Sequence, residues 1–439
     1  MEPPMRKKAE NTSNRKPEGL ELRNLAATWR QVLLPMVAGI VTTKKALHEW
    51  VADMGMAALV GVMEADAERV VGCRKGGHQD GRRLGHWGYT NTPFPYDGRQ
   101  VVLPRPRVRT ADKKQEVTLP SVRQFQSLDP MSARVVDQIL LGVSTRGYET
   151  SLGPGPEGLR TKGAKKSRVS EVFVEETRRR MKDRLAEKLD ELDLVAMLLD
   201  GVHVAQHAIV VGLGVTRDGR KHILGLRQGS TENATLCADL LQDFVGRGLK
   251  NIEGLLYVLD GGKGLRTAIR NVAGDSAVVQ RCQQHKRRNV VGHLPQARQM
   301  TVDRMLVDAY NSESLKTARK RLGQIVSWLD RNGEEDAAAS LREGMEETLT
   351  VWKLDLPEPL RRFFATTNAI ENVLGVVRRV SRNVKHWRHG AMAKRWTGIG
   401  LVAAEKRFKR IKGHRHMPAL VEALSRRAAK GIDQEESAG

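Results

Sequence analysis

The chain has 439 residues and a formal net charge of +23, so a neutral or acidic surface is excluded and a polyanionic partner, most simply nucleic acid, is indicated. Its length predicts two to three domains. Three widely separated cysteines give no disulfide framework, and no window reaches the ~20 apolar residues of a membrane span. Because the N-terminus also lacks the apolar core of a signal peptide, we expect a cytoplasmic protein.

Residues 1–72 are predicted to form a helical N-terminal region that follows a polar start. Apolar residues recur at three- and four-residue spacings after Leu20, which predicts one helix early in this stretch and a second from about Lys44 to Val71. The pattern leaves open whether the two helices form a small bundle or a dimerisation face.

Residues 73–190 are predicted to form a DNA-binding region that opens with a strand-and-loop module. Glycines interrupt regular structure first, and a strand follows the turn signal Asp97-Gly98. Arg105, Arg107 and Arg109 alternate on that strand, so an extended backbone places them on one face, where they suit phosphates. The alternative is a solvated edge strand protected by charge and proline.

The second half of this region is predicted to hold a helix over 129–142 and another over 170–181. Lys165, Lys166 and Arg168 stand just before the second helix. A helix, a turn and a helix with a basic start are typical of a helix-turn-helix DNA reader, whose second helix contacts bases with its N-terminal residues. An ordinary helical hairpin gives the same pattern, and the sequence does not choose between them.

The central block, residues 191–290, has the pattern of an α/β core. Helices are predicted over 233–245 and 264–272. Short apolar runs predict strands near 194–200, 207–216, 221–228, 254–260 and 277–281. Three consecutive strands, a helix, a strand, a helix and a strand match the element order of an RNase H-like fold.

Two of these apolar runs end on a carboxylate followed by glycine, at Asp200 and at Asp260. If both strands lie in one sheet, the two carboxylates share an edge, where their oxygens suit a hard divalent ion such as Mg²⁺ or Mn²⁺. An Asp before a Gly is also a common turn residue, so either position alone is ambiguous. The pair together indicates a metal site.

Cys282 and His285 follow with a C-x-x-H spacing, which is half of a zinc site without a partner pair. We therefore expect a structural or DNA-positioning role for this pair, and whether it binds a metal stays open. The adjoining Lys286, Arg287 and Arg288 favour a helix start that faces DNA.

An all-helical insertion is predicted over 291–360, before a final helix and a basic helical region over 361–430 and a tail over 431–439. From Arg361 to Lys430 the chain holds 18 Lys and Arg against three Asp and Glu, which favours contact with nucleic acid. The candidates for DNA contact on and just after the final helix are Arg378, Arg379 and Arg382.

The final helix is expected to begin near Asn368 and to pack a stripe that includes Ile370, Leu374 and Val377 on the sheet. Glu371 would then point at the two aspartates. The alternative is a capping box, in which Asn368 caps the helix and Glu371 reaches back to its backbone N–H. The metal role is favoured because two aspartates leave most of a metal's coordination sphere open.

Together these residues resemble bacterial transposases of the mutator type, a class of DDE transposases related to the plant Mutator elements. The resemblance covers roughly residues 100–420, and its motifs are specific as a set although each is weak alone. The motifs are Asp200-Gly201-Val202, Asp218 to Leu226, Thr231-Glu232-Asn233-Ala234, Val258-Leu259-Asp260-Gly261, Gln280 to Asn289, and Thr366-Thr367-Asn368-Ala369-Ile370-Glu371.

The resemblance implies an α/β RNase H-like catalytic core in which Asp200, Asp260 and Glu371 hold two divalent ions, Mg²⁺ or Mn²⁺. One ion would activate water or a 3′-hydroxyl, and the other would stabilise the leaving oxygen in an in-line attack on DNA. Relatives recombine double-stranded DNA at the terminal inverted repeats of an insertion sequence, as dimers or higher oligomers, in the bacterial nucleoid. The alternatives are a catalytically silent, transposase-derived DNA-binding protein and an RNase H-like nuclease without strand transfer.

Overall fold

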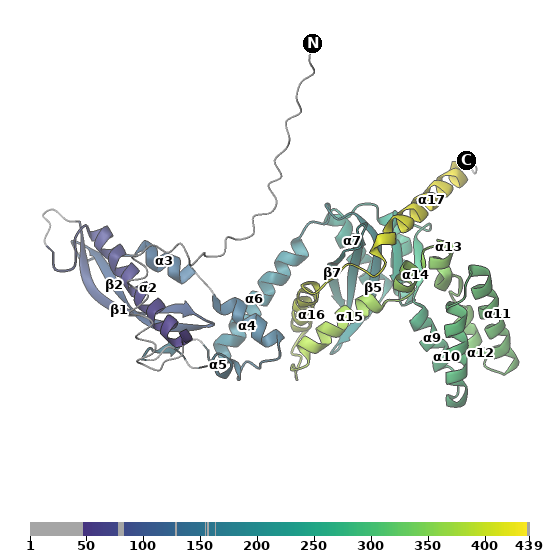
Figure 1. The fold of residues 1–439 in the computed structure, drawn as a ribbon, viewed down its shortest axis with the longest axis horizontal. Helices are drawn as coiled ribbons and strands as arrows, with labels where there is room; N and C mark the ends of the chain where they lie inside the picture. The colour runs from purple at the N-terminus through teal and green to yellow at the C-terminus, as the bar shows by residue number, and fades with distance from the viewer. Residues whose placement is uncertain are drawn as a thin grey trace, which may run out of the picture. The chain divides into compact units, whose positions relative to one another are not determined.

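The computed structural model describes residues 47–77, 83–127, 130–153, 155, 158–162 and 164–436 (Figure 1). The chain forms two compact units, one from Met1–Asp129 with Leu152–Gly163 and the other from Pro130–Ser151 with Ala164–Gly439. The helix expected soon after Leu20 lies outside the described residues, and the six-segment division expected from the sequence stays a prediction. Within the described ranges, no helix is long and apolar enough to cross a membrane.

The first unit is a long β-hairpin covered by a helix. Strands β1 (Leu84–Tyr96) and β2 (Arg99–Thr110) are antiparallel, and α2 (Leu47–Val71) packs against β2. Asp97 and Gly98 connect the strands with φ angles of 39° and 83°, as the primed hairpin turns require. The turn signal and the second strand are therefore confirmed.

The expectation that glycines interrupt regular structure before this turn holds for Gly76 and Gly77, which follow the end of α2, but is wrong for Gly85 and Gly88. Strand β1 runs through Gly85 and Gly88. Gly88 has a φ of 74° at the point where the register shifts between His86 and Tyr89, so glycine here permits a bulge within the strand. The cross-strand bonds to β2 compensate for the poor strand propensity of glycine, and a local pattern does not contain that information.

The second unit is built on a five-stranded sheet in the order β7-β6-β5-β8-β9. Strands β5 (Leu194–Val204), β6 (His207–Thr216) and β7 (Lys221–Gly229) form an antiparallel meander, and β8 (Leu256–Leu259) and β9 (Val278–Arg281) continue the sheet in parallel with β5. All five strands expected from the sequence are present, which confirms the mixed α/β core.

Helices cover both faces of this sheet. One face carries α7 (Ala234–Gly246) and α8 (Lys263–Ala273), and the other carries α15 (Asn368–Ser381) and α16 (Gly390–Glu405). From Ala196 to Leu199 the residues of β5 contribute alternately to the two apolar cores, because side chains alternate along a strand. Burial on both faces explains why these strands are near-continuous apolar runs.

Residues 283–364 are mostly helical, as predicted for the insertion, and their first four helices enclose a separate apolar core. These helices are α9 (Gln283–Gly292), α10 (Gln296–Tyr310), α11 (Leu315–Arg331) and α12 (Glu335–Arg342). Figure 1 shows them projecting from one end of the sheet. The chain then returns through α13 (Thr350–Lys353) and α14 (Glu358–Phe364) to α15.

The helix-turn-helix prediction is met only in part. Within the second unit, α4 (Pro130–Leu140) packs on α6 (Lys166–Ala186), which begins four residues earlier than expected. The connection between them contains α5 (Tyr148–Ser151) and the short strand β4 (Thr161–Lys162) in place of a turn of three to four residues. The pair is therefore a helical hairpin with a long connection. The final element is α17 (Met417–Glu436).

Candidate functional site

The two aspartates predicted as metal ligands stand at the same level of neighbouring parallel strands, Asp200 within β5 and Asp260 directly after β8. Leu199 of β5 is in register with Leu259 of β8, and the next residue on each strand is Asp200 or Asp260. Paired strands lie about 4.8 Å apart, so the two side chains start from adjacent backbones. Asp260 also caps the turn that follows it, since its Oδ1 accepts a hydrogen bond of 2.8 Å from the N–H of Gly262. Asp260 can therefore stabilise the turn and still be a candidate metal ligand.

Asp200 is the most buried of these carboxylates, with 7% of its surface exposed. Burial first, and then the negative charges of Asp260 and Glu371, raise the pKa of Asp200 to about 7, although His285 and the N–H of Gly201 oppose the increase. Neither aspartate forms an ion pair with a Lys or Arg among the described residues. The site thus concentrates negative charge, and among the described residues only His285 opposes it in part.

Glu371 enters the site from α15, where the predicted stripe of Ile370, Leu374 and Val377 is buried against the sheet. The capping box weighed from the sequence does not form. Asn368 is the first residue of the helix, and the cap position belongs to Thr367, whose hydroxyl donates a 2.8 Å hydrogen bond to Glu371 Oε1. The Glu371 carboxylate is therefore held by a side chain that the sequence did not single out.

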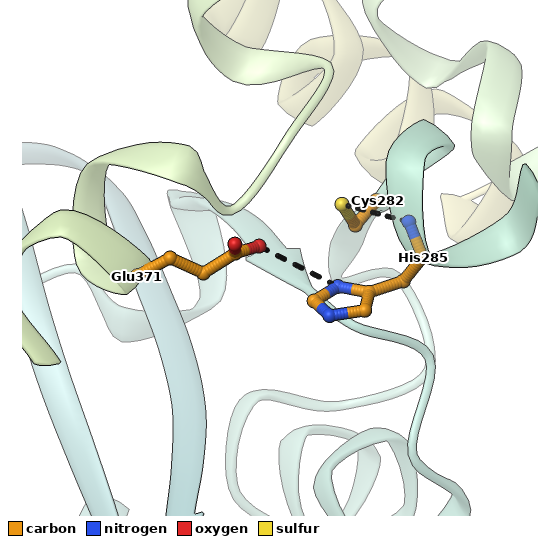
Figure 2. A group of neighbouring side chains, drawn as sticks. All are labelled: Cys282, His285 and Glu371. Atoms are coloured by element: carbon orange, nitrogen blue, oxygen red, sulfur yellow. Dashed lines mark hydrogen bonds and ion pairs between the residues drawn. The ribbon is translucent and has the colours of Figure 1, made fainter. Parts of the chain in front are cut away.

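Thr367 also joins the C-x-x-H pair to Glu371. The buried Sγ of Cys282 accepts hydrogen bonds of 3.4 Å from the backbone N–H of His285 and from both the N–H and the hydroxyl of Thr367. Nδ1 of His285 lies 3.3 Å from the Thr367 hydroxyl and 3.8 Å from Glu371 Oε1. Figure 2 shows the imidazole facing the carboxylate, with the sulfur beside the start of α9.

Cys282 and His285 shift each other's pKa in opposite directions. Burial alone would raise the pKa of the Cys282 thiol, but the hydrogen bonds from His285 and Thr367 outweigh it and lower that pKa below its usual value. The hydrogen bond with Cys282 raises the pKa of His285, and the charges of Cys282, Glu371 and Asp260 add to this effect. The protonated form of His285 is thus favoured relative to that of a free histidine, and its ring lies beside the acidic site.

Cys282, His285 and Glu371 are also close enough to share one metal ion, because one ligand atom from each lies within 4.8 Å of the others. No other such group occurs in the described ranges, so the three predicted carboxylates are not equally close together. A sulfur, an imidazole and a carboxylate suit Zn²⁺, whereas the aspartates offer only oxygens. The structure therefore has two neighbouring sets of possible metal ligands: the mixed set of Cys282, His285 and Glu371, and the oxygen set of the two aspartates.

Sequence reasoning missed one further carboxylate, Glu232, which lies in the turn before α7. Burial and the charge of Asp260 raise the pKa of Glu232, which shows that the two side chains are near each other. The motif Thr231-Glu232 contributed to the family resemblance, but nothing in its spacing from Asp200 indicated a place in the site.

The arginine row of β2 is present in the first unit. Pro106 and Val108 are buried between the arginines, so Arg105, Arg107 and Arg109 share the opposite face, as predicted. Glu116 of the short strand β3 (Glu116–Val117) contacts all three arginines, at 2.7, 2.6 and 3.9 Å respectively. One carboxylate therefore offsets part of the charge that the row would offer to a phosphate.

The other basic residues predicted to contact DNA lie in the second unit, and they differ in exposure and in whether an acidic side chain already binds them. Seven are exposed, namely Lys165, Lys166, Arg168, Arg288, Arg378, Arg379 and Arg382. Arg168 lies 3.5 Å from Glu171, and Arg287 forms two hydrogen bonds with Asp303. The exposed arginines of α15 have no acidic partner in the described part of the chain.

Lys286 departs from its predicted role. Its side chain is fully buried, and its ammonium group donates hydrogen bonds of 2.5 and 2.6 Å to the backbone carbonyls of Ser340 and Glu343. These bonds join α9 to the end of α12. Because this burial argues against a contact with DNA, we leave Lys286 out of the proposed DNA surface.

Comparisons with known proteins fit this arrangement. The profile of a family described as "Transposase, Mutator family" matches residues 31–410. The transposase for insertion sequence element ISRM5 of Rhizobium meliloti is 27% identical over 334 residues, which cover 72% of this chain and 78% of that protein. The transposase for IST2 of Acidithiobacillus ferrooxidans is 29% identical over 206 residues, or 46% of this chain and 66% of that protein.

A third relative is the transposase for IS6120 of Mycolicibacterium smegmatis, 28% identical over 199 residues, which cover 44% of this chain and 60% of that protein. The chain thus spans slightly less than two thirds of the IST2 and IS6120 proteins that it matches.

Proposed function

The chain belongs to the Mutator family of transposases, and we propose that it is an insertion-sequence transposase that cleaves DNA at the ends of its element and joins the freed strands to a target. The observation that supports this most is the position of Asp200 and Asp260, side by side on parallel strands and without a basic partner among the described residues. The negative charge of Glu371 also raises the pKa of the buried Asp200, which supports a place for Glu371 near the two aspartates.

The architecture supports an RNase H-like assignment for this core. Three antiparallel strands followed by two parallel strands, in the order β7-β6-β5-β8-β9, give the element order expected of that fold. Asp200 lies on the central strand, Asp260 ends the next strand, and Glu371 lies on a helix that packs on one face. The helical insertion separates the last two carboxylates in sequence.

The donor set fits Mg²⁺ or Mn²⁺, because hard divalent ions take carboxylate oxygens and tolerate bound water at the remaining positions. Asp200, Asp260 and Glu371 would hold two such ions, which supply an activated hydroxyl nucleophile and stabilise a leaving oxygen when bound. The sheet fixes the two aspartates at a constant separation, while Thr367 orients Glu371. The exposed arginines of α15 would bind phosphates beside the site.

We base the proposed DNA binding on the excess of basic residues. We further propose that the protein binds the terminal inverted repeats and the target DNA, and that it does so as an oligomer. The net charge of +23 supports salt-sensitive binding to any duplex. Recognition of the element's ends would come from the exposed start of α6 and from the arginine row of β2. Those residues lie in different units, so each contact surface is testable by itself.

A cleavage assay tests this function directly. Purified protein is incubated with Mg²⁺ and a duplex that contains the inverted repeats flanking its gene, and strand breaks are mapped. We expect breaks at the repeat ends for the wild type, none for Asp260→Asn, and wild-type breaks for Asp239→Asn, which removes an exposed carboxylate of α7. DNA binding should be retained in all three proteins. Cleavage by Asp260→Asn at the wild-type rate would refute the proposal, and binding without cleavage by the wild type would support the silent alternative.

A further inference from the structure

A fourth carboxylate, that of Glu232, faces the sheet edge where Asp200 and Asp260 lie. Glu232 belongs to the turn between β7 and α7, and the next residue, Asn233, caps α7 by accepting a hydrogen bond of 2.9 Å from the N–H of Leu236. The cap of the helix is thus already provided. Glu232 is left with a half-buried side chain that no helix-capping role explains.

The position of the Glu232 carboxylate is set by its packing over Gly201. A Cβ added to Gly201 would overlap Oε2 of Glu232 and would lie 2.9 Å from Cδ. Gly201 lies inside β5 and does not have a positive φ, so its conformation does not require glycine. A side chain at position 201 would therefore have to displace the flexible carboxylate end of Glu232, so glycine here leaves that carboxylate its place over β5.

Gly262 gives a second point of reference on the neighbouring strand end. A Cβ added there would lie 3.3 Å from Oδ1 of Asp260 and 3.6 Å from Oε1 of Glu232. Both oxygens therefore lie within 3.6 Å of one point in space. Gly201 and Gly262 thus line the space that the carboxylate of Glu232 occupies.

Glu232 makes no hydrogen bond or ion pair with any side chain of the described ranges. Placing an unpaired carboxylate in a half-buried position beside another carboxylate is unfavourable, because both desolvation and like-charge repulsion oppose it. The dipole of α7 favours a negative charge near its N-terminus, but that effect is worth about 0.3–1 kcal/mol and does not require the side chain to turn toward Asp260. A cation between the carboxylates would remove the repulsion.

We propose that Glu232 is a fourth carboxylate ligand of the divalent-metal site, beside Asp260. This inference rests on the proposed function. Four carboxylates balance the charge of two divalent ions, whereas three leave one positive charge for substrate phosphates alone to offset. Gly201 and Gly262 give the added ligand its space.

Binding of Mn²⁺ to the full-length protein, without DNA, tests this role independently of catalysis. Free Mn²⁺ is measured by its electron paramagnetic resonance signal during titration of the wild type, Glu232→Gln, Glu232→Asp and the matched control Asp239→Asn. We expect Glu232→Gln to weaken at least one Mn²⁺ site by tenfold or more and Asp239→Asn to bind as the wild type does. Glu232→Asp keeps the charge but shortens the side chain, so a direct ligand predicts that it also loses affinity.

The same titration of Asp260→Asn separates failure of this inference from failure of the proposed function. If Asp260→Asn loses Mn²⁺ and Glu232→Gln does not, the fourth ligand is refuted and the proposed site stands. Full affinity in Glu232→Asp with loss in Glu232→Gln would also overturn it, because Glu232 would then act only through its charge. Wild-type affinity in Asp260→Asn, or no binding by the wild type, would refute the metal site itself. Circular dichroism spectra identical to the wild type confirm that each variant is folded.

Discussion

Replacing Asp200 with Asn should stabilise the metal-free protein, even though it removes a residue of the proposed metal site. The carboxylate is 7% exposed, and burial together with the charge of Asp260 raises its pKa from 3.8 to about 7. The folded protein therefore binds an extra proton between these two pH values, and its stability falls as the pH rises through that window. Asn has the same shape and never ionises, so it avoids this penalty.

The size of the effect follows from the two pKa values. A difference of about 3 pKa units at roughly 1.4 kcal/mol per unit gives a destabilisation of at most about 4 kcal/mol once the pH exceeds 7. The penalty accumulates as the pH rises from 3.8 to about 7, and pH 5 lies only about one unit into that window, so less than half of the penalty is present there. The advantage of Asp200→Asn should therefore grow with pH.

Thermal unfolding in EDTA at about pH 5 and pH 8 measures this difference. For a unit of this size, 1 kcal/mol corresponds to roughly 2 °C, so we expect Asp200→Asn to unfold about 4–8 °C above the wild type at pH 8 and much closer to it at pH 5. Asp239→Asn, an exposed carboxylate of the same unit, should change neither value. Saturating Mg²⁺ should stabilise the wild type more than Asp200→Asn. A midpoint at or below the wild type at pH 8 in EDTA would refute the electrostatic reasoning.

Three further outcomes follow from the contacts. Thr367→Val removes the hydroxyl that holds the third carboxylate, so cleavage of end DNA should fall by about 10–100-fold with DNA affinity unchanged, whereas Thr367→Ser should remain active. Lys286→Met removes the ammonium donor to the Ser340 carbonyl and one of the two donors to the Glu343 carbonyl, which Arg281 also contacts, so urea unfolding should show a loss of about 1–3 kcal/mol, and an unchanged stability with weakened DNA binding would contradict its structural role. Alanine at Arg378, Arg379 and Arg382 should weaken binding to all duplexes alike and reduce the salt dependence of log Kd by up to about one per arginine, as filter binding at several salt concentrations would show.

The strands of the second unit were predictable because their signals are local. Each is a short apolar run, and the turn between β6 and β7 is marked by Asp218-Gly219, where Gly219 has a φ of 79°. Strand β1 was not predictable because Gly85 and Gly88 weaken its local pattern, and only its pairing with β2 makes it a strand. The register of Leu199 with Leu259 likewise depends on pairing between distant segments.

Those residues of the candidate site whose role is visible in the neighbouring sequence could be predicted. Asp200 and Asp260 each end an apolar run, and that pattern survives without knowledge of the rest of the fold. Glu232 and Thr367 were missed because their roles depend on what faces them across the site. Lys286 was misjudged for the same reason, since its carbonyl partners lie more than fifty residues later in the chain.

The four carboxylates are held in two different ways, and this determines which mutations at a distance can affect them. Asp200 and Asp260 are fixed by hydrogen bonds between paired strands, so their separation changes only if the sheet does. Glu371 and Glu232 are held by a helix and a turn that pack on that sheet, and Thr367 and Gly201 set their directions. Changes in the packing of α15 or α7 should therefore misplace the glutamates while the aspartates stay in place. Such changes would lower catalysis more than stability, because an ångström of misplacement matters to a metal ligand far more than to an apolar contact.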